Sequence, residues 1–334
     1  MIIVSVDAGG STTDCIAVDS TLDLLGVAQG GPGNYLAVGA ETARDNVAAT
    51  IERALSPTDP IEEPVVGGFG FAGMQLAEQE AVVREFLADI DVLESFEIVS
   101  DVALSHYALT AGDPGIAVVA GTGATAYGRD ESGADVRTSG WGWLLGDEGS
   151  GFSLARRGLQ TAARGFDGRG PETELTDRAT QHFDVDSFLE IIKPVYEHAE
   201  PPGNIASFAE EVTAAAQAGD AVALDLLREA GEELALAAKA VDDELDLADP
   251  VSVGGVGGLL ESTLVREQFV SAVTEQFQAP DVLEPIQHPV VGGVALAADN
   301  HAFSIDVDQL QALDTRIERA GIDATEPQLQ PSRD

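Results

Sequence analysis

The chain has 334 residues, 44% of them hydrophobic, which is enough for two α/β lobes with a core each. Its 58 acidic and 17 basic residues give a net charge of −41, which argues against nucleic acid and anionic membrane as partners because like charges repel. The lone cysteine, Cys15, excludes an internal disulfide and a cysteine-based metal site within one chain. The five histidines lack metal-ligand spacing, so any metal would be oxygen-ligated, which favours magnesium.

The acidity indicates a habitat rather than a chemistry. The acids are spread along a chain of globular composition. Repulsion on this scale is costly unless salt screens it, and the Debye length of a 1 M salt solution is only about 3 Å. We therefore expect a halophilic protein from a salt-rich cytoplasm, as in halophilic archaea. No apolar run reaches membrane-spanning length and no leader resembles a signal peptide, which also predicts a cytoplasmic protein.

The opening segment, residues 1–19, predicts a strand–turn–strand hairpin. An apolar β-branched run ends at Asp7, and a short polar turn leads directly into a second apolar run. Turn glycines let the backbone approach an anion, hydroxyls add donors, and a carboxylate beside them suits hydrated magnesium. An ordinary glycine-containing hairpin turn is the alternative. The turn residues are Gly9, Gly10, Ser11 and Thr12.

The rest of the first lobe, which we place at residues 1–112, alternates helices and strands. Asn34 lies in a polar turn that is either a plain loop or a source of an amide for a substrate. We expect helices at 40–55, 74–87 and 102–111. A strand that begins at about residue 64 should lead into a loop, and a second, short strand should occupy residues 96–100.

Two features of this lobe have competing interpretations. Residues 68–73 fit the dinucleotide pattern G-x-G-x-x-G, but no clear acidic residue ends a following strand, so a Rossmann site is disfavoured. A P-loop is excluded because Gly-Lys-Ser/Thr is absent. Asp101 follows a strand and begins a helix. Taken alone it is favoured as a helix N-cap, and a general base at the strand end is the alternative.

The second lobe, which we place at residues 113–300, opens with a partial copy of the first hairpin. Residues 8–12 align with residues 120–124 without a gap, and the second turn carries Gly121, Thr122 and Gly123. Such a repeat suggests two related lobes that face each other across a cleft.

Residues 139–151 form the densest segment of the chain, with both tryptophans, two adjacent acids and several glycines. This composition favours a binding loop, in which acids accept hydrogen bonds from substrate hydroxyls and aromatic faces pack on a sugar ring or a base. Helices should follow to about residue 249, then a strand from 251 into a glycine turn, and closing helices at 289–298 and 307–320. The segment 301–334 would hold the closing helix, for which packing back on the first lobe is left open, and a tail, of which residues 328–334 should be disordered.

Several motifs recur in the order and spacing of one family. They are the opening hairpin, the Ser-Asp pair ending at residue 101, Ala-Gly-Thr-Gly from 120, Gly-Asp-Glu-Gly-Ser-Gly at 146–151 and Gly-Gly-Val at 254–256. Over residues 1–299 they resemble the N-acetylglucosamine kinase and Bad/Bcr-type ATPase family, within the superfamily of acetate and sugar kinases, heat-shock ATPases and actin.

The resemblance implies an α/β fold of two ribonuclease H-like lobes facing a central nucleotide cleft, with ATP and Mg²⁺ as cofactors. Asp7 would orient the magnesium and Asp101 would be the catalytic base. The phosphates would be held by Gly9, Gly10, Ser11, Thr12, Gly121, Thr122 and Gly123. The adenosine pocket would be lined by Gly254 and Gly255, and the sugar held by Asn34, Asp101, Gly140, Trp141 and Asp147.

The chain departs from this family at Thr12, where members often carry a basic residue, so magnesium and backbone donors would neutralise more of the phosphate charge. Another branch, the activators of 2-hydroxyacyl-CoA dehydratases, holds an iron–sulfur cluster with cysteines of paired subunits. Cys15 lies inside the opening hairpin, which argues against such a cluster.

The resulting hypothesis is an ATP-dependent kinase acting on N-acetylglucosamine, glucosamine or a related amino sugar, with a homodimer left open. An ATPase switch that regulates a partner protein is the main alternative. A non-catalytic sugar-binding module is a third, disfavoured by the intact Asp7 and Asp101.

Fold and activity should both require high salt. Dilution from molar KCl lengthens the Debye length to about 10 Å at 0.1 M, so the carboxylates repel one another and both melting temperature and turnover should fall. Magnesium and ATP should partly restore the fold by binding only the native state. Melting curves across a KCl series test this, and a melting temperature that stays flat from low to molar salt would contradict it.

Overall fold

The computed structural model describes residues 1–58, 60–74, 76–196, 201–299, 301 and 303–321. The chain forms two compact units. Unit 1 comprises Met1–Asp113 and Ile286–Asp334, and unit 2 comprises Pro114–Pro285. The expected disordered tail, residues 328–334, lies outside the described residues.

Unit 1 contains a five-stranded sheet in the order β3-β2-β1-β4-β5. Its strands are β1 (Ile2–Ala8), β2 (Thr13–Asp19), β3 (Leu24–Gly30), β4 (Val65–Phe71) and β5 (Ser95–Ser100). β1, β2 and β3 pair antiparallel, as the opening hairpin predicts, with one strand more. β4 pairs parallel to β1, and β5 parallel to β4, so β1, β4 and β5 end at the same edge of the sheet.

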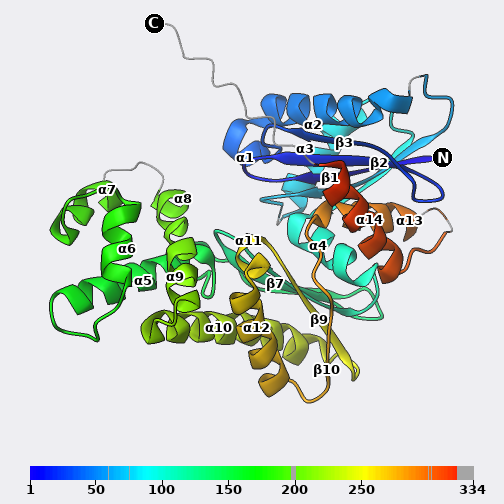
Figure 1. The fold of residues 1–334 in the computed structure, drawn as a ribbon. Helices are drawn as coiled ribbons and strands as arrows, with labels where there is room; N and C mark the ends of the chain where they lie inside the picture. Colours follow the sequence, from blue (N-terminus) through cyan, green and yellow to red (C-terminus); the bar gives the residue numbers. More distant parts are fainter. Residues whose placement is uncertain (59, 75, 197–200, 300, 302, 322–334) are drawn as a thin grey trace, which may run out of the picture. The chain divides into compact units, whose positions relative to one another are not determined.

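Helices cover both faces of this sheet. They are α1 (Tyr35–Val38), α2 (Ala40–Leu55), η1 (Ser56–Thr58), α3 (Ala77–Ala88), α4 (Asp101–Thr110), η3 (Pro289–Val291), α13 (Gly292–Asp299) and α14 (Val307–Ala320). Figure 1 shows α2 along one face, with α4, α13 and α14 on the other. Alternate residues of β1, starting at Ile2, join α2 and α3 in one buried core, because successive side chains of a strand point to opposite faces.

Residues 286–299, which we predicted in the second lobe, belong to unit 1 instead. α13 packs on β1, β4 and α4, and the Ser5 hydroxyl donates a hydrogen bond to the carbonyl of Val290. The approach is close: a Cβ built on Gly293 would lie 2.2 Å from the Gly68 carbonyl oxygen. The His288 backbone N–H and Nδ1 lie 2.9 and 2.8 Å from Asp314 Oδ1 on α14, which ties the returning segment to the last helix.

Unit 2 repeats the sheet of unit 1. Its strands are β6 (Gly115–Ala120), β7 (Ala124–Arg129), β8 (Asp135–Ser139), β9 (Val251–Val256) and β10 (Pro280–Val282), in the order β10-β9-β6-β7-β8. β6, β7 and β8 pair antiparallel, while β9 and β10 continue the sheet in parallel. The two units therefore share one topology, and each of the two matching turns follows the first strand of its sheet.

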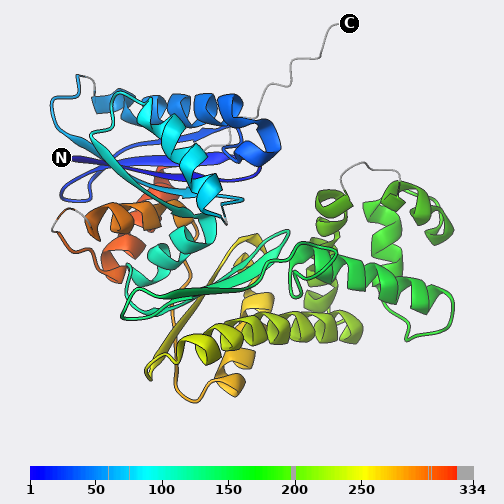
Figure 2. The same cartoon turned by 180° about the vertical axis from the view of Figure 1, so that it is seen from behind.

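The helices of unit 2 are α5 (Gly151–Phe166), α6 (Leu175–His182), η2 (Phe188–Ile191), α7 (Ile192–Tyr196), α8 (Pro201–Ala206), α9 (Phe208–Gln217), α10 (Ala221–Leu245), α11 (Gly258–Glu261) and α12 (Thr263–Gln276). α10 packs against β6, β7 and β8, and α12 packs on α10 (Figure 2). The helices α6, α8 and α9 each pack against α5. Within the described ranges, no helix combines the length and apolar character that a membrane span requires.

Gly293→Ala should destabilise the protein, because the new Cβ would lie 2.1 Å from Ser5 Oγ and 2.2 Å from the Gly68 oxygen. Overpacking of this kind costs about 1–3 kcal/mol. Denaturant unfolding in molar KCl measures the loss. Gly203→Ala is the control, because its Cβ would meet no atom within 4 Å. Equal stability of both variants would contradict the packing of α13.

Candidate active site

Each of the two matching turns is closed by a backbone hydrogen bond and has open space beside it. In unit 1 the Gly9 N–H donates to the Thr12 carbonyl at 2.8 Å, and in unit 2 the Gly121 N–H donates to the Gly123 carbonyl at 2.9 Å. A Cβ built on Gly10 or on Gly121 would meet no protein atom within 4 Å. Each turn thus leaves room for a group that comes close to the backbone, which suits phosphate oxygens.

Three carboxylates gather in unit 1 near the end of β1. Asp7 pairs with Asp14 across β1 and β2, so both side chains lie on the same face of the sheet. Burial raises the pKa of Asp7 to about 8, and the nearby carboxylates of Asp101 and Asp14 add to that rise. Burial also raises the pKa of Asp14, whose Oδ1 accepts a hydrogen bond from Gln29 at 2.7 Å.

This arrangement suits a divalent cation that is bound mainly by other groups. Among the described residues, no set of three or more His, Cys, Asp or Glu side chains is placed to hold a metal. Mg²⁺ commonly takes one or two protein carboxylates and completes its shell with water and substrate phosphate. Burial and the nearby carboxylates of Asp101 and Asp14 raise the pKa of Asp7, and a divalent cation would offset both effects, so the donor set fits magnesium brought in with a nucleotide.

Asp101 is not the cap of the helix that it begins. The N-cap of α4 is Ser100, whose hydroxyl accepts the Ala103 N–H at 3.2 Å. Asp101 is the first helical residue, and its Oδ1 accepts the Val102 N–H at 2.9 Å. The capping role that the sequence favoured is thus filled by the preceding residue. Asp101 lies at the end of β5, at the sheet edge where β1 ends near Asp7.

Asn34 lies at the same edge of unit 1. Its backbone N–H donates to the Gly9 carbonyl at 3.2 Å, which fixes the turn that contains Asn34 against the turn of residues 9–12. Its Oδ1 accepts the Leu36 N–H at 3.0 Å and caps α1. In the described part of the chain its amide Nδ2 has no hydrogen-bond partner, so this donor is available to a ligand.

The loop between β8 and α5 brings Asp147 to the second turn. Asp147 has a φ of +58° and is 8% exposed. Its Oδ1 accepts the Gly142 N–H at 3.1 Å, and a Cβ built on Gly123 would lie 2.8 Å from its Oδ2. Burial raises the pKa of this carboxyl. Asp147 therefore supports its own loop while it lies against the turn.

Other residues of this loop differ in exposure. Trp141 is 70% exposed, which leaves its ring free to cover a ligand. Trp143 packs edge-on against Phe152 of α5, with ring centroids 5.4 Å apart. Gly140 has a φ of +70° and lies against Thr125 of β7. The loop thus presents one tryptophan outward and uses the other for packing.

A cavity of about 690 Å³ opens beside the second turn, entirely within unit 2. It is lined by Gly121 and Thr122, by residues of α9, and by residues around α11. The Ser262 hydroxyl on its wall is buried without a hydrogen-bond partner among the described residues. Such a cavity has the size and the polar groups that a nucleoside requires.

Gly254 and Gly255, which the resemblance assigned to the adenosine pocket, do not line this cavity. They lie inside β9, and the cavity wall is formed by the residues after that strand, from Gly258 onward. Their role toward adenosine stays a prediction. Strand residues are covered by neighbouring elements, whereas residues beyond the strand end remain accessible. The sequence did not indicate the residues contributed by α9, which carry no motif. They are Ala209, Glu210, Thr213, Ala214 and Gln217.

Comparison with known proteins places this geometry in a class. The two matching units form the ribonuclease H-like fold that sugar kinases and actin-like ATPases share. A protein of Chromobacterium violaceum assigned as an N-acetylglucosamine kinase superimposes with a TM-score of 0.70 at 25% identity, over 89% of this chain and 98% of that one. A glucokinase of the ROK family from Streptomyces griseus, at 17% identity and a TM-score of 0.57 over 90% and 98%, shows the fold alone.

The chain belongs to the BadF/BadG/BcrA/BcrD ATPase family, whose model matches residues 4–298. It is 29% identical over 301 residues to an N-acetylmuramic acid/N-acetylglucosamine kinase of Clostridium acetobutylicum, over 88% of this chain and 97% of that one. It is 25% identical to an N-acetyl-D-glucosamine kinase of Dictyostelium discoideum, over 90% and 98%.

Asp7→Asn should change how stability depends on pH. The pKa of Asp7 rises from 3.8 to about 8 on folding, so the folded state keeps a proton that the unfolded state releases. Wild-type stability should therefore fall as pH rises from about 4 to about 8, and the variant should lose this part of the slope and melt higher at pH 8.

Melting temperatures across that pH range, in molar KCl without nucleotide, test the prediction. Asp281→Asn, at an exposed position of β10, is the matched control and should keep the wild-type slope. Parallel curves for Asp7→Asn and wild type would show that Asp7 is already ionised in the free protein.

Proposed function

We propose that the protein is an ATP-dependent kinase that phosphorylates a hydroxyl of an amino sugar, such as N-acetylglucosamine or glucosamine. One observation carries the proposal. In unit 1, Asp101, Asp7 and the available amide of Asn34 are grouped around the turn of residues 9–12. The names of the curated relatives support the same substrate class.

In this proposal Asp101 is the general base. It accepts the proton of the attacking sugar hydroxyl, which increases the negative charge on that oxygen as it bonds to the γ-phosphorus; the bond from the γ-phosphorus to the bridging oxygen breaks, and ADP leaves with that oxygen. We assign the sugar-binding role to Asn34, Asp101, Gly140, Trp141 and Asp147. Amide and carboxylate groups would hydrogen-bond the hydroxyls, and the exposed Trp141 ring would pack on the apolar face of the sugar.

We assign the phosphates to the backbone N–H groups of the two turns. The hydroxyls of Ser11, Thr12 and Thr122 add further donors. Magnesium, when bound with the nucleotide, supplies positive charge at the phosphate oxygens. Asp7 would hold that ion through its carboxylate. Binding of the ion favours the ionised form of Asp7, so magnesium binding and loss of the Asp7 proton are linked.

The cavity beside Gly121 takes the nucleoside. It adjoins the turn that would bind the phosphates, which is the order that a nucleotide requires. Ser262 supplies an unpartnered hydroxyl on its wall, and the side chains of Glu210 and Gln217 supply further polar groups. We assign adenosine to this cavity.

The charge of −41 supports a reaction in a salt-rich cytoplasm.

An ATPase that switches a partner protein is the alternative within the same family. Cys15, the chain's single cysteine, is buried in the core of unit 1, where it could not bridge to a second subunit. This observation argues against a cluster-bearing activator. The kinase is supported if ADP release depends on an amino sugar, and the switch is supported if ATP hydrolysis is indifferent to a panel of sugars.

Asp101→Asn should abolish most phosphoryl transfer and leave ATP binding nearly unchanged. A positioned base contributes about 10²–10⁴-fold to the rate. Asparagine can still accept the Val102 N–H, so the start of α4 should persist. Single-turnover transfer and nucleotide titration in molar KCl separate the two effects. Wild-type turnover in this variant would remove Asp101 from the reaction.

Asp147→Ala should raise the KM for the sugar far more than the KM for ATP, because Asp147 is assigned to the sugar. The Asp147 carboxylate also accepts the Gly142 N–H, so removing it affects the loop as well as the sugar. The variant Asp147→Asn keeps an oxygen that can accept this N–H, and it therefore separates sugar binding from loop support. The control is Glu148→Gln, at the exposed neighbouring position. Initial-rate titrations of both substrates measure the split. Collapse of nucleotide affinity in Asp147→Ala would contradict the assignment.

A further inference from the structure

Unit 2 contains a cavity of about 590 Å³ in which arginines gather. It lies between the C-terminal part of α5, the loop that follows this helix, and the start of α10. Three of its eleven lining residues are arginines, Arg157, Arg164 and Arg169, whereas the whole chain has 17 basic residues in 334. The cavity shares no lining residue with the one beside Gly121, so the two are separate sites.

The end of α5 brings two of these arginines together. The Arg169 N–H donates to the Arg164 carbonyl at 2.8 Å, so the chain turns back on the helix after its last residue. The turn depends on Gly168, whose φ is +69°. Arg164 lies in the last turn of α5, where a positive charge also interacts favourably with the helix dipole. The dipole accounts for one base there, but not for the second base that the turn holds beside it.

The charges around the cavity do not balance. Arg157 is paired with Glu229, and Arg169 is paired with Asp167, whose Oδ2 accepts from Nε at 3.0 Å and from Nη2 at 2.6 Å. Arg164 has no ion-pair or hydrogen-bond partner among the described residues. Because acids outnumber bases by 58 to 17, an arginine without an acidic partner is unexpected. The cavity therefore offers a positive charge to a ligand.

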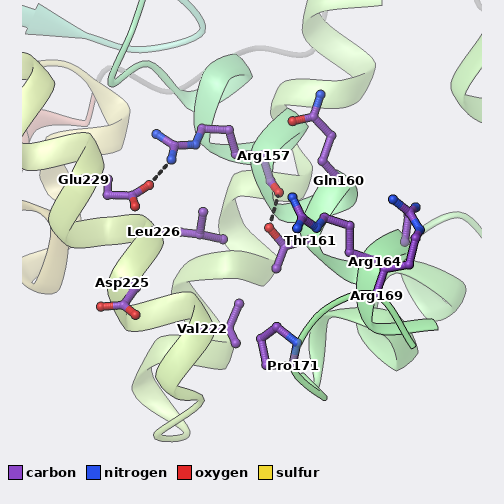
Figure 3. A pocket seen from close by; sticks show the side chains of 11 residues that line it. Arg157, Gln160, Thr161, Arg164, Arg169, Pro171, Val222, Asp225, Leu226 and Glu229 are labelled. Atoms are coloured by element: carbon purple, nitrogen blue, oxygen red, sulfur yellow. Dashed lines mark hydrogen bonds and ion pairs between the residues drawn. The ribbon is translucent and has the colours of Figure 1, made fainter. Parts of the chain in front are cut away.

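The opposing charges lie on different walls of the cavity. Figure 3 shows Arg164 and Arg169 on one side, and Asp225 and Glu229 of α10 on the other. Both acids are already engaged, Glu229 in its ion pair within the cavity and Asp225 with Arg228 at 3.7 Å. An anion at the arginine wall thus meets positive charge at short range, while the carboxylates across the cavity are neutralised by their own partners.

We propose that this cavity binds a phosphomonoester of the sugar phosphate class, with its phosphate group on Arg164 and Arg169. A guanidinium group presents planar pairs of N–H donors that match phosphate oxygens. Arg164 supplies an unengaged group, and Nη1 of Arg169 makes no hydrogen bond among the described residues. A carboxylate would match one guanidinium, whereas a phosphate has the charge and the oxygens for both. The proposal does not depend on the kinase assignment.

The rest of the cavity fits the organic part of such an ester. Its volume of about 590 Å³ falls in the range of small-molecule sites and leaves room beyond a phosphate ion. The side-chain amide of Gln160 has no hydrogen-bond partner among the described residues, so it is available to hydroxyl groups. Pro171, Val222 and Leu226 form an apolar wall that suits ring carbons. A sugar ring has both kinds of surface.

Equilibrium dialysis with radiolabelled inorganic phosphate, at constant ionic strength in molar KCl, tests the phosphate part. Arg164→Gln and Arg169→Gln should each weaken binding at least about tenfold, because each removes charge-assisted hydrogen bonds. Arg156→Gln is the matched control, because it removes the same charge from the same helix at an exposed position that does not line this cavity. It should keep the wild-type affinity.

The difference between these variants reports this cavity alone, because phosphate held at the turns of the candidate active site would contribute equally to all of them. Melting curves must show that the three variants fold, which is expected because each side chain is exposed. A wild type without saturable phosphate binding would overturn the proposal. So would equal binding by the wild type and both cavity variants, or an equal loss in Arg156→Gln.

Competition tests the ester part. Unlabelled ligands are added, and the component of binding that Arg164→Gln removes is followed. N-acetylglucosamine 6-phosphate should displace the label at a lower concentration than inorganic phosphate does, because its ring also contacts Gln160 and the apolar wall. N-acetylglucosamine alone should not displace it. A sugar phosphate that competes no better than inorganic phosphate would overturn the assignment to an ester, and displacement by the unphosphorylated sugar would overturn recognition through the phosphate.

Discussion

The parallel pairing of β1 with β4 and of β4 with β5 is the constraint on which the candidate site depends. It aligns the ends of three strands at one edge of the sheet, although residues 8, 71 and 100 are far apart in the chain. Asp7 and Asp101 meet there because one lies just before the end of β1 and the other just after the end of β5. Neither carboxylate would influence the other without this register.

The same pairing explains why the chain must return to unit 1. β1 and β4 are buried strands, and the face carrying Ser5 and Gly68 needs an apolar cover. α13 provides it, and it can come close only because Gly68 and Gly293 lack side chains. The closing segment, through α13 and α14, thus completes the core beneath the proposed catalytic carboxylates.

Much of this arrangement could be predicted from the sequence because it follows from local patterns. Continuous apolar runs indicated β1, β4 and β6, and helical spacing indicated α2 and α14 with the observed bounds. The repeated turn indicated two related units. β3, β8 and β10 were not predicted, because they are short or mixed in polarity and are defined by pairing with a neighbour. The placement of residues 286–299 depends on long-range packing that no local pattern encodes.

The site residues divide in the same way. Those carried by turns and strand ends have a sequence motif, and their proposed roles stay predictions that the variants must test. The lining of the cavity in unit 2 has no motif, because α9 contributes it from one face of an ordinary helix. Gly254 lies inside β9 rather than in the glycine turn after it, because a glycine-rich strand and such a turn look alike in sequence and only the strand pairing shows where the strand ends.

The acidity of this chain limits how an anion can be held near the second turn. The chain carries 58 acids against 17 bases, Asp147 lies against Gly123, and Glu210 lines the adjoining cavity. Among the described residues, no basic side chain lines that cavity. A Cβ built on Gly121, however, would meet no protein atom within 4 Å, so an anion can come close to the backbone itself. An acidic chain can therefore accept a phosphate where the backbone, rather than a basic side chain, makes the contact.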